Sequence, residues 1–405
     1  MGIDYVRRTA TFERVDGKQA TFPLDSDGAG TGSIREAWFG TSSTDILIRT
    51  TAGDDVVLRG EDRRPDVVKP VVYLDQNHWS TISKAIHAPE RVKAPGECAA
   101  ALAIARLALR GHVALPMSAG HMYETTKWTA DLDRYRLALT LLQLGGGWIM
   151  DDPLAVRRVE ISAALGQRYH GATPPKFTPF GHDWSRLFAA ERAPTAPTAP
   201  TDFGRIEQAQ FVRWTSVVGI AATLLDDDPI EPAQSTGWAE SMQRFTDWLA
   251  TEQTEQPLRI ARTDLAFLAD MSTTIAEEAH ALRLSIDDLH DWNLHHHGED
   301  VDRSPMLGLF REAMRQKLAT STTTWTQNDL TDLMYLSCGA GYADVVVGER
   351  QLVGQLNGGA QRLRRSLRAF RRLQDALPTI LDLVGDLSVG PGSKRSDSEG
   401  QADAG

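Results

Sequence analysis

Short, unbroken runs of apolar residues in two stretches of the chain predict strands that are buried on both faces. The runs occupy residues 71–74, 112–118 and 343–347, and a segment with helical periodicity follows each of them. Such runs are typical of parallel strands that helices cover on either side. A strand, a helix and a further strand at this spacing favour a right-handed crossover. The pattern therefore predicts an α/β domain with a central parallel sheet.

Alanine- and leucine-rich segments between these strands predict helices. The clearest helix covers residues 97–110 and stops at Gly111. A longer helix is predicted over 119–144, and a very short strand at 148–150 precedes another helix at 154–165. In the second stretch, Thr326 and Asp329 form a predicted start for the helix at 330–340.

Residues 1–69 have the pattern of β-hairpins. One hairpin is predicted from 10–15 and 20–24, and another from 44–50 and 55–59 around Gly53 and Asp54. The stretch contains no cluster of carboxylates, cysteines or histidines. It therefore predicts a small β-rich N-terminal module that packs on the rest of the chain or binds a protein partner.

Residues 166–324 interrupt the α/β pattern. The composition turns to Thr, Pro, Gly and His, and the repeat at 193–200 favours extended geometry and predicts a spacer. Residues 204–320 then place apolar side chains at helical spacing and predict an all-helical insertion. The α/β domain is thus expected in two parts, 70–165 and 325–385, with a disordered tail at 386–405.

Composition narrows the class of protein. The chain has 405 residues and a formal net charge of −11, so nucleic-acid binding would need a local basic patch. Its two cysteines, Cys98 and Cys338, provide neither a disulfide framework nor a Cys-x-x-Cys site. No signal-peptide pattern and no run of about 18 apolar residues occurs. We therefore expect a cytoplasmic protein without a membrane partner.

Four acidic residues accompany the predicted strands. Asp75 directly follows the first strand, and Glu124 lies in the helix after the second. Asp332 falls one turn into the helix before the third strand, and Glu349 follows that strand. Ligands of α/β proteins bind at the carboxyl edge of the sheet, where we expect these side chains to meet. Each residue alone could instead cap a helix or face solvent.

The order of these residues resembles that of a PIN-like nuclease domain. In that family a first strand ends in Asp, a helix after the second strand supplies Glu, and a later helix and strand supply two further acidic residues. The matching segments are Tyr-Leu-Asp-Gln-Asn-His-Trp with Asp75, Pro-Met-Ser-Ala-Gly-His-Met-Tyr-Glu with Glu124, and Asp-Leu-Met-Tyr-Leu with Asp332. Glu349, in Val-Val-Val-Gly-Glu-Arg, stands where the family commonly has Asp. The resemblance covers roughly 71–165 and 325–356 and implies a PIN-like three-layer domain.

Converging carboxylates without cysteine suit Mg²⁺ or Mn²⁺ rather than Zn²⁺. Such an ion offsets charge on a phosphate and lowers the pKa of an attacking water. The resemblance implies a metal-dependent nuclease, with RNA preferred over single-stranded DNA. The catalytic residues and metal ligands would be Asp75, Glu124, Asp332 and Glu349. The alternative is a non-catalytic PIN-like scaffold or RNA-binding protein, which the Glu in the fourth position keeps open.

Polar residues near these acids have two interpretations. Asn77 and His78 are expected to contact the nucleic acid, although helix capping and helix packing explain them equally well. The histidines at 295–297 cannot all face one ion on a helix, so they predict a polar loop in the insertion.

An arginine-rich helix is predicted over 361–373. Leu363, Leu367 and Phe370 form an apolar stripe along it. The stretch holds six arginines without an intervening acid, and four of them are expected to bind phosphate groups, namely Arg362, Arg364, Arg365 and Arg368. A solvated face paired with neighbouring acids is the alternative.

Overall fold

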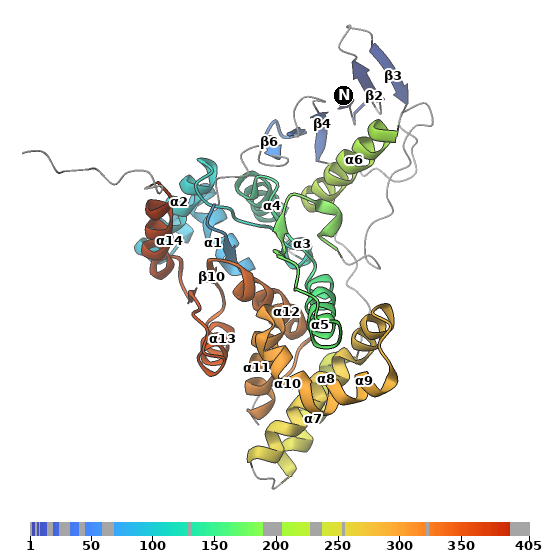
Figure 1. The fold of residues 1–405 in the computed structure, drawn as a ribbon. Helices are drawn as coiled ribbons and strands as arrows, with labels where there is room; N and C mark the ends of the chain where they lie inside the picture. Colours follow the sequence, from blue (N-terminus) through green and yellow to red (C-terminus); the bar gives the residue numbers. More distant parts are fainter. Residues whose placement is uncertain are drawn as a thin grey trace, which may run out of the picture.

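This mixed α/β protein is mostly helical and contains a small parallel sheet and an antiparallel sheet near the amino terminus (Figure 1). The structure, a computed structural model, describes residues 2–4, 6–7, 9–13, 19–23, 33–39, 45–58, 69–127, 131–188, 205–226, 237–252, 256–320 and 324–388. The predicted α/β class is therefore confirmed.

The antiparallel sheet has the strand order β3-β2-β1-β4-β5-β6. Its strands are β1 (Gly2–Asp4), β2 (Thr9–Glu13), β3 (Gln19–Pro23), β4 (Ile34–Phe39), β5 (Ile46–Thr50) and β6 (Asp55–Leu58). Both predicted hairpins are present, β2 with β3 and β5 with β6. Gly53 in the second turn has a φ of +92°, which glycine adopts without steric cost.

The parallel sheet centres on β7 (Val72–Leu74). This strand pairs with β10 (Val345–Val347), and β10 pairs with β11 (Ala369–Phe370). On the other side of β7, isolated parallel bridges join Val71 to Ala114 and Met117 to β8 (Ile149–Met150). An antiparallel partner, β9 (Phe180–Gly181), then completes this side.

The predicted strand at 112–118 is present only as an extended segment between β7 and β8. The backbone N–H of Ala114 donates to Pro70 at 2.9 Å, and that of Met117 donates to Trp148 at 3.0 Å. Pro116, between them, has no N–H and cannot continue a ladder. The segment therefore changes partner from β7 to β8 instead of forming a regular strand.

Helices cover both faces of the parallel sheet. In β7, Val72 and Leu74 belong to one apolar cluster and Tyr73 belongs to the other, as the alternation of a strand requires. The first face carries α1 (Gln76–His87), α2 (Pro95–Leu109), α4 (Asp131–Gly145) and α14 (Leu373–Ser388). The second carries α5 (Pro153–His170), α11 (Pro305–Ala319), α12 (Gln327–Tyr342) and α13 (Arg350–Arg362). The prediction of a strand buried on both faces at residues 71–74 is confirmed for Val72–Leu74, whereas Val71 is half-buried.

A glycine lets α12 lie close to the sheet. A Cβ built on Gly339 would come within 2.5 Å of the Tyr73 ring, a distance that no side chain tolerates. Because Asp332 lies two turns earlier on the same helix, this contact also fixes where Asp332 lies relative to β7.

Two helices occupy the region predicted as one helix at 119–144. They are α3 (Ala119–Thr126) and α4, and residues 128–130 between them are outside the described part of the chain. The helix α14 was not predicted. It begins at Leu373 because Glu97 accepts hydrogen bonds from the backbone N–H groups of Leu373 and Gln374. It continues to Ser388, and the rest of the expected tail lies outside the described residues.

The arginine-rich helix predicted at 361–373 is wrong. The helix α13 ends at Arg362, Arg364 has a φ of +54°, and Ala369–Phe370 forms β11. Backbone hydrogen bonds from β10 explain the change, since Val346 donates to Arg368 at 2.9 Å and Gly348 donates to Phe370 at 3.0 Å. The supposed stripe also divides, with the leucines in one apolar cluster and Phe370 in the other.

The helical segment after β9 packs on the rest of the chain at both ends. Its helices are α6 (Arg205–Leu225), α7 (Trp238–Thr251), α8 (Gln256–Ala281), α9 (Ile286–Asp291), the π-helical turn η4 (Trp292–His296) and α10 (His297–Arg303). Trp214 of α6 stacks on Phe39 of β4 at 5.2 Å between ring centroids, and α11 packs against both α12 and α13. The spacer predicted at 193–200 lies outside the described residues.

The polar loop expected at residues 295–297 is instead helical, because this stretch completes η4 and begins α10. Of the helices that the structure describes, none combines the length and apolar character needed to cross a membrane.

Candidate active site

The four acidic residues predicted as a site line one cavity of about 320 Å³ at the carboxyl edge of the parallel sheet. Asp75 follows β7, Glu349 follows β10, and Glu124 and Asp332 project from α3 and α12. The sheet order reverses at β7, because the next extended segment lies on one side of it and β10 on the other. Ligands of open α/β sheets bind at this kind of switch point.

Asp75 is held by the first turn of α1. Its Oδ1 atom accepts a hydrogen bond from the backbone N–H of Asn77 at 2.6 Å and lies 3.4 Å from Nδ1 of His78. Burial raises the pKa of Asp75, but the hydrogen bond and charge of His78 and the Asn77 N–H outweigh it, so the pKa lies below its ordinary value. Asp75 is therefore a fixed, ionised carboxylate.

His78 connects Asp75 to the segment after β11. Its Nε2 atom lies 3.2 Å from the backbone carbonyl oxygen of Arg371, and its side chain is only 9% exposed. Burial lowers the pKa of His78, yet the bond to Asp75 and its charge raise it above the ordinary value. The expected contact of His78 with nucleic acid has no support in this position, since both ring nitrogens face protein groups. Asn77, by contrast, is exposed at the cavity wall.

Glu124 is positioned through the start of α3. Ser118 and His121 form a reciprocal cap, in which the Ser118 backbone N–H donates to Nδ1 of His121 at 3.0 Å. The other ring nitrogen of His121, 2.8 Å from the carbonyl oxygen of Leu74, donates to it. Burial lowers the pKa of His121 to about 4, so this histidine is neutral. Because Leu74 precedes Asp75 and Glu124 lies one turn after His121, this bond fixes the two carboxylates relative to each other.

Asp332 and Glu349 come from the second stretch of the domain. The predicted start of α12 is confirmed, because Asp329 accepts from the backbone and hydroxyl of Thr326, and Asp332 follows one turn into the helix. Asp332 is half-buried, whereas Glu349 is exposed at the start of α13.

The carboxylates disfavour one another's charge. Burial, followed by the charges of Asp332 and Asp75, raises the pKa of Glu124 to about 7. Burial, followed by the charges of Asp75 and Glu349, raises the pKa of Asp332 to about 6. Like charges gathered in a partly buried cavity have this effect. The cavity thus holds one firmly ionised carboxylate, Asp75, and two whose pKa values are raised, that of Asp332 to about 6 and that of Glu124 to about 7.

Several lining residues were not expected from the sequence, among them Gln76, Lys127, Asn328 and Tyr335. The Gln76 side chain donates to Thr125 at 2.8 Å, but its Oε1 atom is buried and has no hydrogen-bond partner among the described residues. The Lys127 ammonium donates to Asn328 at 3.2 Å and links α3 to α12. Gln76 stands next to Asp75 in the sequence, but only the packing of α1 against α3 turns it toward the cavity.

The donor set fits a hard divalent cation. Among the described residues, no three His, Cys, Asp or Glu side chains lie close enough together to hold one ion. Mg²⁺ needs only one or two carboxylates as direct ligands and keeps several bound waters. Other oxygen atoms of the site can accept hydrogen bonds from these waters. Four carboxylates and the unpartnered Gln76 oxygen around one cavity supply such a set. The residues that could hold the ion are Asp75, Glu124, Asp332 and Glu349.

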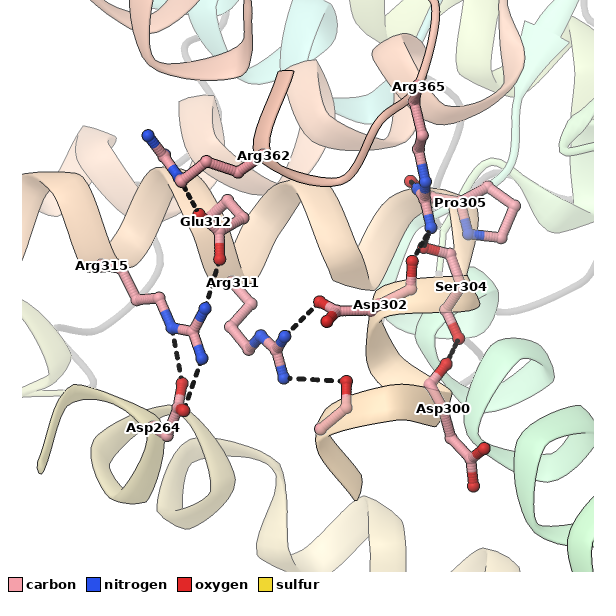
Figure 2. Close-up of polar contacts among 11 residues, drawn as sticks. Asp264, Asp300, Asp302, Ser304, Pro305, Arg311, Glu312, Arg315, Arg362 and Arg365 are labelled. Carbon is pink, nitrogen blue, oxygen red and sulfur yellow. Dashed lines mark hydrogen bonds and ion pairs between the residues drawn. The ribbon is translucent and has the colours of Figure 1, made fainter. Parts of the chain in front are cut away.

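Two of the arginines expected to bind nucleic acid instead bind residues of α11 and of the turn before it (Figure 2). Arg362 pairs with Glu312 through Nε. Arg365 is half-buried and donates to the carbonyl oxygens of Pro305 at 2.9 Å, Ser304 at 3.0 Å and Asp302. These contacts hold the segment after α13 against α11. Arg364 and Arg368 are exposed.

Searches of protein-family models, curated proteins and solved structures find no significant match to this chain.

Proposed function

We propose that this protein is a metal-dependent nuclease with a PIN-like domain, and that RNA is its preferred substrate. One observation carries the proposal. Four carboxylates from four separate segments of the chain surround a single cavity at the point where the sheet order reverses. Like charges that are held close together disfavour folding, so such a cluster indicates a functional site. A bound cation would offset the repulsion between the carboxylates. The preference for RNA rests on the family resemblance alone.

Asp75, Glu124, Asp332 and Glu349 would hold Mg²⁺ or Mn²⁺. Such an ion, when bound, neutralises charge on a phosphodiester and lowers the pKa of an attacking water. Asp75 is the principal candidate ligand because it is ionised and fixed by its bonds with Asn77 and His78.

The other cavity residues have separate roles. In the metal-free cavity Glu124, with a pKa of about 7, can take up or release a proton near neutral pH, and a bound cation would favour its ionised form. The buried Oε1 atom of Gln76 has no partner and can accept a hydrogen bond from a water in the cavity. Lys127, exposed at the rim, can contact a phosphate oxygen.

Asp75→Asn tests the proposed nuclease directly. The substitution keeps the shape of the side chain and removes its charge, so cleavage of a labelled single-stranded RNA with Mn²⁺ should fall by about a hundredfold or more. Asp382→Asn is the matched control, because Asp382 is exposed on α14 and its loss changes the net charge equally. Wild-type cleavage that persists in EDTA, or equal cleavage by Asp75→Asn, would contradict the proposal.

A non-catalytic PIN-like scaffold or RNA-binding protein is the second candidate. The observation that favours it is Glu349 in the fourth position, which is exposed whereas the other three carboxylates are half-buried. Calorimetry of Mn²⁺ binding separates the two functions. A nuclease requires binding that Asp75→Asn weakens, whereas a scaffold requires no difference between Asp75→Asn and Asp382→Asn.

A further inference from the structure

The pairing of three strands brings two arginines to the same edge of the sheet as Asp75. In the parallel register, Leu74 of β7 pairs with Val347 of β10, and Val347 pairs with Phe370 of β11. The next residue of each strand is therefore at one level, namely Asp75, Gly348 and Arg371. Neighbouring strands lie about 4.8 Å apart, so the backbone of Arg371 is roughly 10 Å from that of Asp75. Arg372 follows directly.

These two arginines differ from the pair bound to α11. Arg371 and Arg372 are exposed, and neither forms an ion pair with a described residue. The Arg371 guanidinium lies along α13, 3.7 Å from the position that a Cβ on Gly354 would take. Arg362 and Arg365, in contrast, are held by a carboxylate and by three carbonyl oxygens. The guanidinium groups that follow β11 therefore remain available to an anionic ligand.

The position of Arg371 is fixed relative to the carboxylates. His78 lies between them, with one ring nitrogen 3.4 Å from Asp75 and the other 3.2 Å from the Arg371 carbonyl oxygen. The backbone bond from Gly348 to Phe370, at 3.0 Å, holds the end of β11 from the other side. The basic pair is thus part of the rigid sheet edge and not of a loose surface loop.

A strand of nucleic acid suits this arrangement of charges. When one phosphodiester of a strand lies at the carboxylates, the next phosphates of that strand lie only several ångströms farther along its backbone. An arginine side chain from the end of β11 can reach them. Guanidinium groups bind phosphate oxygens in a bidentate manner. On a chain with a net charge of −11, two unpaired arginines beside an acidic cavity form a local attraction for a polyanion.

The recessed carboxylates favour a single strand over a duplex. The Asp75 side chain is 16% exposed and Glu124 is half-buried, so a phosphate must enter the cavity to reach them. A single strand can bend its backbone inward. A duplex is stiff over about 150 base pairs and presents its phosphates on a cylinder.

We propose that Arg371 and Arg372 bind the phosphates of a single-stranded nucleic acid next to the phosphodiester that lies at the four carboxylates. The inference rests on the proposed nuclease function, which it extends from the reacting group to the substrate strand. It moves the phosphate-binding role from Arg362, Arg364, Arg365 and Arg368 to the two arginines at the carboxyl end of β11.

The test uses two double variants of the full chain. Arg371→Gln with Arg372→Gln removes the proposed pair, and Arg364→Gln with Arg368→Gln removes two exposed arginines that precede β11. Both change the net charge by the same amount. Binding of a fluorescent single-stranded RNA is measured by anisotropy at several salt concentrations, with Ca²⁺, which binds oxygen ligands, and cleavage is measured separately with Mn²⁺.

We expect the Arg371/Arg372 variant to bind at least about tenfold more weakly and its salt slope to fall by about 1.4, the value for two phosphate contacts to a single strand. The Arg364/Arg368 variant should bind like the wild type, and a duplex of the same sequence should bind more weakly than the single strand. Equal loss in both variants, no loss in either, or stronger duplex binding overturns the inference.

The outcomes of binding and cleavage separate the two proposals. If the wild type cleaves RNA and Asp75→Asn does not, but the Arg371/Arg372 variant binds normally, the nuclease proposal stands and the arginine inference fails. If binding depends on Arg371 and Arg372 while the wild type never cleaves, the arginine inference stands and the nuclease proposal fails.

Discussion

Asp75 and Glu124 line the same cavity, yet their surroundings move their pKa values in opposite directions. Asp75 gains a hydrogen bond and a positive neighbour from His78, which outweigh its burial. At Glu124, burial and the charges of Asp332 and Asp75 outweigh the charge of Lys127 and raise the pKa to about 7. Divergent pKa values of neighbouring carboxyl groups are the usual basis for separate acid and base roles.

From the raised pKa of Glu124 we predict how the stability of the protein changes with pH. The folded protein keeps a proton on Glu124 that the unfolded chain loses above its ordinary pKa of 4.5, so stability falls as the pH rises from about 4.5 to 7. In EDTA, Glu124→Gln should therefore raise the melting temperature at pH 8 and have little effect at pH 4. The measurement is thermal unfolding at both pH values.

Glu349→Gln is the control for this prediction. Glu349 lines the same cavity but is exposed, so its neutralisation should change the melting temperature less than that of Glu124 at pH 8. An increase for Glu124→Gln that is the same at pH 4 and pH 8 would argue against charge repulsion and for a simple packing effect.

At the level of elements, the segment after α13 shows how pairing overrides a local pattern. Its arginines and leucines have ordinary helix propensity and an apolar spacing that a helix would use. The edge of β10, however, offers unpaired backbone groups, which Ala369–Phe370 satisfies as β11. Arg365 donates to three carbonyl oxygens around the start of α11, which holds the turn before β11 in place.

Arg364→Gly tests the turn. Arg364 has a φ of +54°, a conformation that costs a non-glycine residue about 1–2 kcal/mol. Glycine relieves this strain but gives the unfolded chain more freedom, so the free energy of unfolding should stay within about 0.5 kcal/mol of the wild type. If the segment were a continuous helix, the same change would cost about 1 kcal/mol. Urea unfolding measures the difference.

Ala276→Gly calibrates this comparison. Ala276 is exposed in the interior of α8, where glycine should lower the free energy of unfolding by about 1 kcal/mol. A loss at Arg364 equal to the loss at Ala276 would indicate a helix rather than a turn.

Across the whole molecule, charged side chains of α11 join helices that lie far apart in the sequence (Figure 2). Glu312 pairs with Arg315 of its own helix and with Arg362 of α13, and Arg315 binds Asp264 of α8 at 2.7 Å. A Cβ on Gly359 would lie 2.9 Å from the Cβ of Glu312, so glycine is what lets α13 approach this network. The helical segment is thus fastened to the helix that follows β10.

Glu312→Ala should destabilise the protein by about 2 kcal/mol, because the buried Glu312 carboxylate bonds two arginines, of which Arg315 keeps its bond to Asp264 and Arg362 is half-exposed. The measurement is urea unfolding with the matched variant Glu277→Ala. Glu277 forms an exposed pair with Arg158, whose loss should cost less than about 1 kcal/mol. Similar losses in the two variants would show that the network adds no more than a surface pair.

The sequence alone determined the features that depend on neighbours along the chain. The apolar run at 71–74 requires burial on both faces, and the acid after it falls at the carboxyl edge wherever the strand is placed in a parallel sheet. The capping pair Thr326 and Asp329 likewise fixes the start of α12, and with it the level of Asp332. These local rules, together with the resemblance to PIN-like domains, selected four residues that the fold brings to one cavity.

Only the tertiary structure decided the features that depend on partners distant in the sequence. The segment at 361–373 became a turn and a strand because β10 and the start of α11 supply its hydrogen bonds. Gln76 faces the cavity because α1 packs beside α3, and Arg371 reaches the level of Asp75 because β11 pairs in one particular register. The partners in these bonds lie about 20 to 60 positions apart in the sequence, and no local pattern records which partner a segment finds.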